Sequence, residues 1–107
     1  MFGSIAVVRP KEGKEAEVVA LFEEWWRVRS PQPVPEAVSG YVFRLVERPD
    51  ELMIPIVFET RESYEANARD PAQSYWHRRL VALLKEEPRW LDGDILASFS
   101  REGQARA

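Results

Sequence analysis

The segment SYWHRRL, residues 74–80, holds the only histidine of this 107-residue chain, His77, next to Trp76, one of four tryptophans. A neutral imidazole can accept a proton from a phenol because imidazole titrates near neutral pH. His77 is therefore our candidate catalytic base. The alternative is a histidine at the boundary of a helix that makes one structural hydrogen bond.

Two polar residues and two tryptophans are candidates for binding a substrate. Tyr64 and Asn67 lie about one helical turn apart, so both could orient a ligand at the mouth of a pocket. Their alternative roles are in capping and turns at the surface. Trp26 and Trp76 could form aromatic walls for a flat ligand, since binding pockets are mostly apolar with few polar groups. Packing in the core is the alternative for both tryptophans, as it is for Trp25.

Two further residues have structural interpretations. Trp90, in the segment PRWLDGD, is expected to anchor the turn before a last strand. Arg44 lies in the middle of a predicted strand, on the same side as Val42 and Val46, and a charge there needs a partner. We expect a salt bridge across a dimer, with an anchor for an anion or a phenolate as the alternative.

Composition excludes several classes of function. The chain has no cysteine, which rules out disulfides, thiol catalysis and nearly all structural zinc sites. Its 15 basic and 18 acidic residues give a net charge of −3 without a basic stripe, which argues against nucleic acid and anionic membranes as partners. We expect no metal and no cofactor. The N-terminus does not resemble a signal peptide and no apolar run is long enough to span a membrane, so we expect a cytoplasmic protein.

Hydrophobic periodicity divides the chain into alternating strands and helices. Thr60 is expected to cap a short helix and Asp70 the longer helix that starts at Pro71 and ends before Pro88. Asp92–Gly93 is expected to be a turn. The predicted order is a strand over 3–10, a helix over 11–29, a loop over 30–40, a hairpin of strands 41–47 and 52–59, the two helices, a last strand over 94–100, and a polar tail over 101–107.

This order of strand, helix, strand, strand, helix, strand is typical of the α+β ferredoxin-like fold. We therefore predict a single βαββαβ domain over residues 1–100, in which helices cover one face of a four-stranded antiparallel sheet. Pro55 cannot donate a hydrogen bond within a sheet, so we expect a bulge or an edge there.

The second face of the predicted sheet indicates a dimer. Both sides of the strands over 41–46 and 52–58 carry apolar side chains, whereas a sheet with one face in water should alternate apolar and polar residues. A large uncovered apolar face is unusual on a monomer. A homodimer that packs sheet against sheet would cover it.

The segment FETRESYEANARDPAQSYWHRRL, residues 58–80, carries a resemblance to a known family. An aromatic and acidic pair, Phe58 and Glu59, is followed by a short helix, a break at Asp70–Pro71 and a longer helix. In this the chain resembles the antibiotic biosynthesis monooxygenase-like branch of the dimeric α/β-barrel superfamily, over residues 3–99. RPKEGKEAEVVALFEE, residues 9–24, is similar to the first strand-to-helix turn of that branch.

The resemblance extends to haem-degrading relatives only in part. Those enzymes use a histidine on the second main helix, a tryptophan about ten residues before it and an asparagine in the first strand. His77 falls at the histidine position, but the tryptophan position falls near Asn67 and the strand SIAVV has no asparagine. This pattern argues against haem degradation.

The resemblance implies a cofactor-independent monooxygenase-like activity on an aromatic or polyketide-type small molecule. In that function His77 would be the base, Asn67 or Tyr64 would orient the substrate, and the tryptophans would form the walls of a pocket between helices and sheet. Two alternatives remain open, a non-catalytic binding module for an apolar ligand and a purely structural dimeric domain. The structural alternative predicts that no ligand-sized cavity exists.

Overall fold

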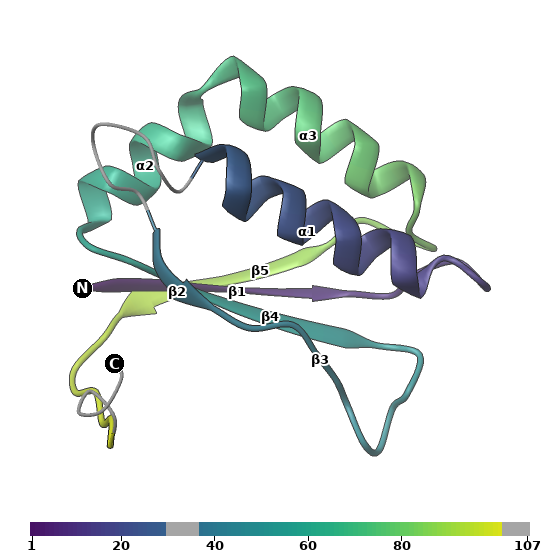
Figure 1. The fold of residues 1–107 in the computed structure, drawn as a ribbon, viewed down its shortest axis with the longest axis horizontal. Helices are drawn as coiled ribbons and strands as arrows, with labels where there is room; N and C mark the ends of the chain where they lie inside the picture. The colour runs from purple at the N-terminus through teal and green to yellow at the C-terminus, as the bar shows by residue number, and fades with distance from the viewer. Residues whose placement is uncertain (30–36, 102–107) are drawn as a thin grey trace.

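The computed structural model describes residues 1–29 and 37–101. In chain order the elements are strand β1 (Phe2–Val8), helix α1 (Glu15–Arg29), strands β2 (Ala37–Gly40), β3 (Phe43–Arg44) and β4 (Leu52–Phe58), helices α2 (Arg61–Arg69) and α3 (Pro71–Ala82), and strand β5 (Arg89–Asp94). All three helices lie over the same face of the sheet (Figure 1).

The strands form one antiparallel sheet in the order β2-β4-β1-β5, with the short β3 paired to β4 beyond the end of β2. Because β2 and β3 occupy the same edge of the sheet, four strand positions run across it. This arrangement confirms the predicted α+β ferredoxin-like βαββαβ fold.

The core lies between the sheet and the helices. Alternate residues of β4 point into it, as a period of two requires, and α1 and α3 supply the opposing layer. Its members are Ala6, Val8, Val18, Leu21, Phe22, Trp25, Ala37, Leu52, Ile54, Ile56, Phe58, Trp76, Leu80 and Leu84. These contacts fix the helices on the sheet and so determine where the polar side chains of α2 and α3 lie.

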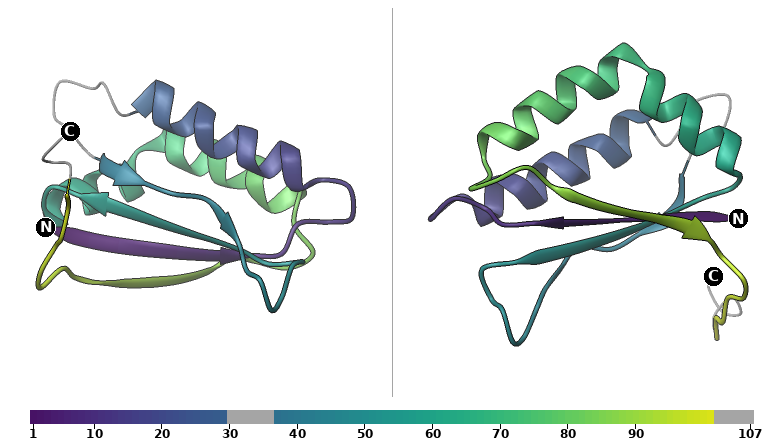
Figure 2. Two further views of the ribbon diagram at one scale, coloured as in Figure 1. Left: turned by 60° about the horizontal axis from the view of Figure 1, so that its bottom comes forward. Right: turned by 180° about the vertical axis from the view of Figure 1, so that it is seen from behind.

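The other face of the sheet has no helix over it in the described part of the chain (Figure 2). The intervening residues of β4, Met53, Pro55 and Val57, belong to that face and are only partly buried. Ile95, just after β5, lies across the same face, since a Cβ added at Gly3 would meet its side chain at 3.4 Å.

The edge formed by β2 and β3 differs from the prediction. Ala37–Gly40 was predicted to be loop, but it forms β2 because it pairs with β4 and buries Ala37. The predicted strand 41–47 contracts to Phe43–Arg44. The remainder of the predicted loop, residues 30–36, lies outside the described residues.

Pro55 lies in a central strand and not at an edge. Its carbonyl accepts a hydrogen bond from the Tyr41 N–H at 3.1 Å, in the gap between β2 and β3. The backbone nitrogen of Pro55 points toward the same gap, since the N–H and C=O of one residue in an antiparallel strand face the same neighbour. Because no strand residue lies opposite in this gap, the absence of an N–H at Pro55 costs no hydrogen bond of the sheet. The bulge in the pairing of β2 with β4 lies elsewhere, in β2 between Ala37 and Ser39.

The C-terminal part of α3 also departs from expectation. The helix ends at Ala82, six residues before Pro88, because the chain returns to the end of β1. There Lys11 N–H donates to the Leu83 carbonyl and Lys85 N–H to the Arg9 carbonyl, both at 2.8 Å. These tertiary hydrogen bonds replace further helical ones.

The last strand lies earlier than predicted. Residues 89–94 form β5, whereas 95–100 have no regular secondary structure. Asp92 pairs with Ser4 and Gly93 with Gly3, so Asp92–Gly93 is part of the ladder and not a turn. Trp90 therefore lies within a strand, not in the turn before one.

Arg44 forms its ion pair within the chain. Its guanidinium donates two hydrogen bonds to the Glu15 carboxylate, at 2.7 and 2.9 Å. The expected salt bridge across a dimer is therefore wrong for this residue: Arg44 ties the β3 edge to the start of α1.

Among the residues that the structure describes, no helix is both long enough and apolar enough to cross a membrane. The predicted tail begins at residue 101, and residues 102–107 fall outside the described ranges.

Candidate functional site

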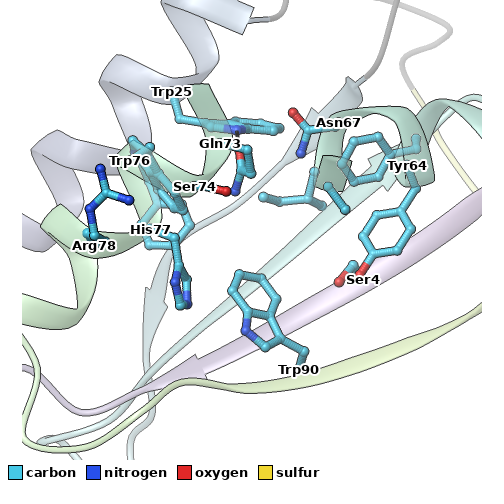
Figure 3. A pocket seen from close by; sticks show the side chains of 14 residues that line it. Ser4, Trp25, Tyr64, Asn67, Gln73, Ser74, Trp76, His77, Arg78 and Trp90 are labelled. Carbon is cyan, nitrogen blue, oxygen red and sulfur yellow. Dashed lines mark hydrogen bonds between the residues drawn. The ribbon is translucent and has the colours of Figure 1, made fainter. Parts of the chain in front are cut away.

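A cavity of about 420 Å³ lies between the helices and the sheet (Figure 3). All three helices contribute side chains to it, as do β1, β4 and β5. Its lining residues are Ser4, Phe22, Trp25, Ile56, Phe58, Tyr64, Asn67, Ala68, Gln73, Ser74, Trp76, His77, Arg78 and Trp90. An apolar hollow with a few polar groups is the usual form of a small-molecule site.

Helix α2 brings Tyr64 and Asn67 to the cavity. The helix begins where Thr60 accepts a hydrogen bond from the Ser63 N–H at 3.0 Å, which confirms the predicted N-cap. Residues three apart lie on one face of a helix, so Tyr64 and Asn67 point to the same side. The cap thus sets the position of both side chains.

Helix α3 supplies the opposite wall. Asp70 caps it through a 2.8 Å hydrogen bond from the Ala72 N–H, with Pro71 at the first helical position, as predicted. Gln73 and His77 lie four residues apart and both line the cavity. The Gln73 side-chain oxygen accepts a hydrogen bond from Trp25 Nε1 at 2.9 Å, which orients that indole.

Trp76 is a fixed wall of the cavity. Its indole is buried, donates from Nε1 to the Leu21 carbonyl at 3.0 Å and meets the ring of Phe22 edge-on, with centroids 5.0 Å apart. An edge-to-face aromatic pair adds to the stabilisation from burial alone. Trp76 therefore both packs in the core and presents one surface to the cavity.

His77 is partly buried, and its ring centroid lies 6.5 Å from that of Trp90 on β5. In residues 1–29 and 37–101, no side chain forms a hydrogen bond or an ion pair with its imidazole. The imidazole points toward Trp90 across one end of the cavity (Figure 3). Its nitrogen atoms are therefore available to a ligand.

The other end of the cavity holds Tyr64 and Ser4. The Tyr64 hydroxyl donates to Asp92 Oδ2 at 2.9 Å, and the Ser4 hydroxyl donates to Asp92 Oδ1 at 2.6 Å. Burial, and then the hydrogen bond to Asp92, raise the pKa of Tyr64, while the Ser4 hydroxyl acts in the opposite direction. Tyr64 is thus a neutral phenol at neutral pH.

Asn67 is buried, and its side-chain oxygen has no hydrogen-bond partner among the described residues. Leaving a buried polar atom unpaired is costly, so such an atom in a native structure requires an explanation. A carboxamide can bind either a donor or an acceptor. The Asn67 side chain also lines the cavity, so its carboxamide is one of the polar groups that a ligand there would meet.

Four of the five residues predicted for the site line this cavity, namely Tyr64, Asn67, Trp76 and His77. Trp26 does not line it. Its side chain lies toward β2, where it borders a separate hollow of about 750 Å³. Trp25, one residue earlier, lines the first cavity where Trp26 was predicted to do so.

Sequence reasoning missed Ser4, Gln73 and Asp92, and it gave Trp90 another role. The signal for Gln73 was present, since it lies four residues before His77 on the same helix. Ser4 and Asp92 could not be linked from the sequence, because their contact depends on the register between β1 and β5.

Comparisons with solved structures agree on the fold. SnoaB, a cofactor-independent oxygenase from Streptomyces nogalater, is 12% identical, with a TM-score of 0.75 over 91% of this chain and 94% of its own. A candidate antibiotic biosynthesis monooxygenase from Chloroflexus aurantiacus is 18% identical, with a TM-score of 0.69 over 92% of this chain and 96% of its own.

A further structure, an antibiotic biosynthesis monooxygenase, is 13% identical, with a TM-score of 0.71 over 91% of this chain and its entire length. The chain therefore shares the ferredoxin-like fold of these structures, which is the fold that its sequence resemblance implied. No protein-family model matches the chain, and no curated protein matches it. At these identities the shared property is the fold.

Proposed function

We propose that this protein is a monooxygenase-like enzyme that needs no cofactor and acts on an aromatic or polyketide-type small molecule. The observation that carries the proposal is the cavity itself. It combines three indoles, an imidazole without a protein hydrogen-bond partner in the described chain and a buried amide with an unpaired oxygen. The structures named above share this fold and support the reaction class.

The proposed chemistry requires a base and a means of holding an anion. His77 removes a proton from a phenol or enol, or from the carbon activated by it, and the ligand becomes an electron-rich carbanion. The carbanion is oxidised by dioxygen directly. For an anthrone, one oxygen atom converts the reacting CH₂ group to a carbonyl, and the other leaves as water with the two hydrogens.

The remaining lining residues position the substrate for this step. Trp25, Trp76 and Trp90 supply flat apolar surfaces for an aromatic ring system. The Asn67 carboxamide can donate a hydrogen bond to the anionic oxygen, whereas the Tyr64 oxygen, whose hydrogen is directed at Asp92, can only accept one from a hydroxyl group of the ligand. Holding the reacting carbon close to the base is a substantial source of rate enhancement.

A binding module without catalysis is the second candidate function. One observation favours it: within the described residues, no carboxylate or carbonyl orients His77, whereas a catalytic base is usually held by a third group. The purely structural alternative predicted that no ligand-sized cavity exists. The cavity of about 420 Å³ argues against it.

The test is consumption of dioxygen by the pure, metal-stripped protein with a panel of anthrones and dihydroxyaromatic compounds. Uptake above the spontaneous rate, unchanged when metal ions are added back, is expected. Tight binding of the same compounds without uptake would favour the binding module instead.

We further propose that the protein is a cytoplasmic homodimer. The apolar face that carries Met53, Pro55 and Val57 has no helix over it in the described part of the chain, and a second copy would cover it. Sedimentation at micromolar concentration tests this: a single dimeric species is expected, and a monodisperse monomer would contradict the proposal.

A further inference from the structure

Asp92 accepts hydrogen bonds from two hydroxyl groups that line the cavity, those of Ser4 and Tyr64. Asp92 itself does not line the cavity. Its two carboxylate oxygens accept one hydrogen bond each, from Ser4 at 2.6 Å and from Tyr64 at 2.9 Å. A carboxylate can only accept, so the Tyr64 hydrogen is directed at Asp92. The Ser4 hydrogen is directed at Asp92 or at the neighbouring Tyr64 oxygen, so neither hydrogen is left for a ligand. The oxygen atoms of Ser4 and Tyr64 therefore have only lone pairs to offer a ligand.

The geometry of this cluster is fixed by the sheet. Asp92 on β5 lies directly opposite Ser4 on β1 in the antiparallel register, so the two side chains share one face. Ser4 is buried, which keeps water from competing for its hydroxyl. Tyr64 reaches the same carboxylate from α2, and its ring packs against those of Phe2 and Phe58.

We propose that Asp92 makes the Ser4–Tyr64 end of the cavity a hydrogen-bond acceptor, so that the cavity selects aromatic ligands that carry a hydroxyl group over the matching methyl ethers. The inference deepens the proposed function by naming a feature of its substrate. It uses the cavity as a ligand site and does not depend on catalysis.

The physical reason is the cost of an unpaired buried acceptor. A ligand hydroxyl donates to the oxygen of Tyr64 or Ser4, whereas a methyl ether has no hydrogen to donate and removes water from the same oxygens. A lost partner of this kind typically weakens binding about tenfold or more. The extra methyl group can change binding by a similar factor through size alone. The role of Asp92 is therefore read from the change in the hydroxyl-to-ether ratio between variants, because the size difference between the two ligands is the same in each.

The substitution Asp92→Asn should give this end of the cavity a hydrogen-bond donor in addition to its acceptors. The new carboxamide has an NH₂ group that can donate to one hydroxyl oxygen. That hydroxyl is then free to turn its hydrogen into the cavity, where it can bind the oxygen of an ether. Preference for the hydroxyl compound should fall, while the volume of the side chain stays almost the same.

The experiment compares the affinities of 1-naphthol and 1-methoxynaphthalene for the full chain, measured by calorimetry. The variants are Asp92→Asn, Tyr64→Phe and, as the matched control, Asp94→Asn. Asp94 lies two residues further along β5, opposite Phe2, and does not line the cavity. Tyr64→Phe keeps the ring and removes its oxygen, so it serves if Asp92→Asn fails to fold.

We expect the wild-type protein and Asp94→Asn to bind the naphthol about tenfold more tightly than its ether. Asp92→Asn and Tyr64→Phe should reduce that ratio to about one tenth of its wild-type value. An unchanged ratio in Asp92→Asn and Tyr64→Phe would overturn the role of Asp92 and leave the proposed oxygenase standing. Failure of the wild-type protein to bind either compound would overturn the inference, whereas the proposed oxygenase is decided separately by dioxygen uptake with the anthrones.

Discussion

Among the described residues, the His77 ring makes one aromatic contact, with Trp90, and no side chain hydrogen-bonds to it. If it is the base, replacing it should slow the reaction without unfolding the protein. We predict that His77→Ala lowers the rate of dioxygen uptake about 10²-fold or more. Tyr75→Phe, at an exposed position two residues earlier, should retain the wild-type rate. Equal rates in both variants would remove His77 from the mechanism.

The hydrogen bond from Trp76 to the Leu21 carbonyl gives a prediction about stability. Trp76→Phe keeps an aromatic ring but leaves a buried carbonyl without that donor. It should lower the free energy of unfolding by about 1–3 kcal/mol, measured by urea denaturation. Trp26→Phe on the partly exposed side of α1 should cost less than about 0.5 kcal/mol. Similar losses in the two variants would show that this hydrogen bond contributes little.

Residue types and helical spacing were enough to predict that Tyr64, Asn67, Trp76 and His77 lie beside one cavity, because all four are on helices whose period is readable from the sequence. They were not enough to choose between Trp25 and Trp26. Adjacent residues on a helix diverge by about 100°, and only packing against the sheet decides which one faces inward. The contacts of Asp92 with Ser4 and Tyr64 depend on pairing between strands that are far apart in the sequence, so no local sequence pattern predicts them.

At the scale of elements, the N-cap of α2 positions Tyr64 and Asn67. Thr60→Ala removes the acceptor for the Ser63 N–H and should destabilise the protein by about 1 kcal/mol. Thr60→Ser keeps a hydroxyl there and should cost much less. Amide hydrogen exchange would check the location of the effect. Faster exchange is expected in the first turn of α2 in the alanine variant only, and uniform acceleration across the protein would contradict a local role.

Element types and order were predictable, whereas several boundaries were not. Pro88 is a sound signal for the end of a helix, yet α3 ends at Ala82 because its next residues hydrogen-bond to the end of β1. Asp92–Gly93 has the composition of a turn, yet register with β1 holds it in β5. In both places a tertiary contact overrides a local preference.

At the scale of the whole molecule, arginine pairs link elements that are distant in sequence. The Arg44 guanidinium holds the pKa of Glu15 below its usual value, and Arg79 does the same for Glu24, in each case chiefly through hydrogen bonds. Because the folded-state pKa of each carboxyl is lowered, the pairs stabilise the fold above the ordinary carboxyl range. That contribution is lost as pH falls through the lowered values.

The corresponding prediction concerns acid sensitivity. The urea midpoint should fall between pH 7 and pH 3, and in Arg44→Gln it should fall by less, because one lowered carboxyl pKa has returned toward normal. The comparison is made within each variant between the two pH values. An identical fall in the wild type and in Arg44→Gln would show that the Arg44–Glu15 pair contributes nothing measurable.

The proposed dimer places Val57 at an interface between sheets. Val57→Lys should convert the sedimenting species from dimer to monomer, because it would bury an unpaired charge. Glu12→Lys adds the same side chain in the exposed segment between β1 and α1 and should leave the dimer intact. If Val57→Lys remains a dimer, the interface is not the sheet face that carries Val57.

Oxygenation by this protein is tested most directly by following the oxygen atom into the product. An anthrone is incubated with the metal-free protein under isotopically heavy dioxygen, and the quinone product is analysed by mass spectrometry beside a protein-free control and His77→Ala. We predict one heavy oxygen atom per product molecule, formed well above the spontaneous rate by the wild type and close to that rate by the variant. Product formation no faster than in the protein-free control would contradict it.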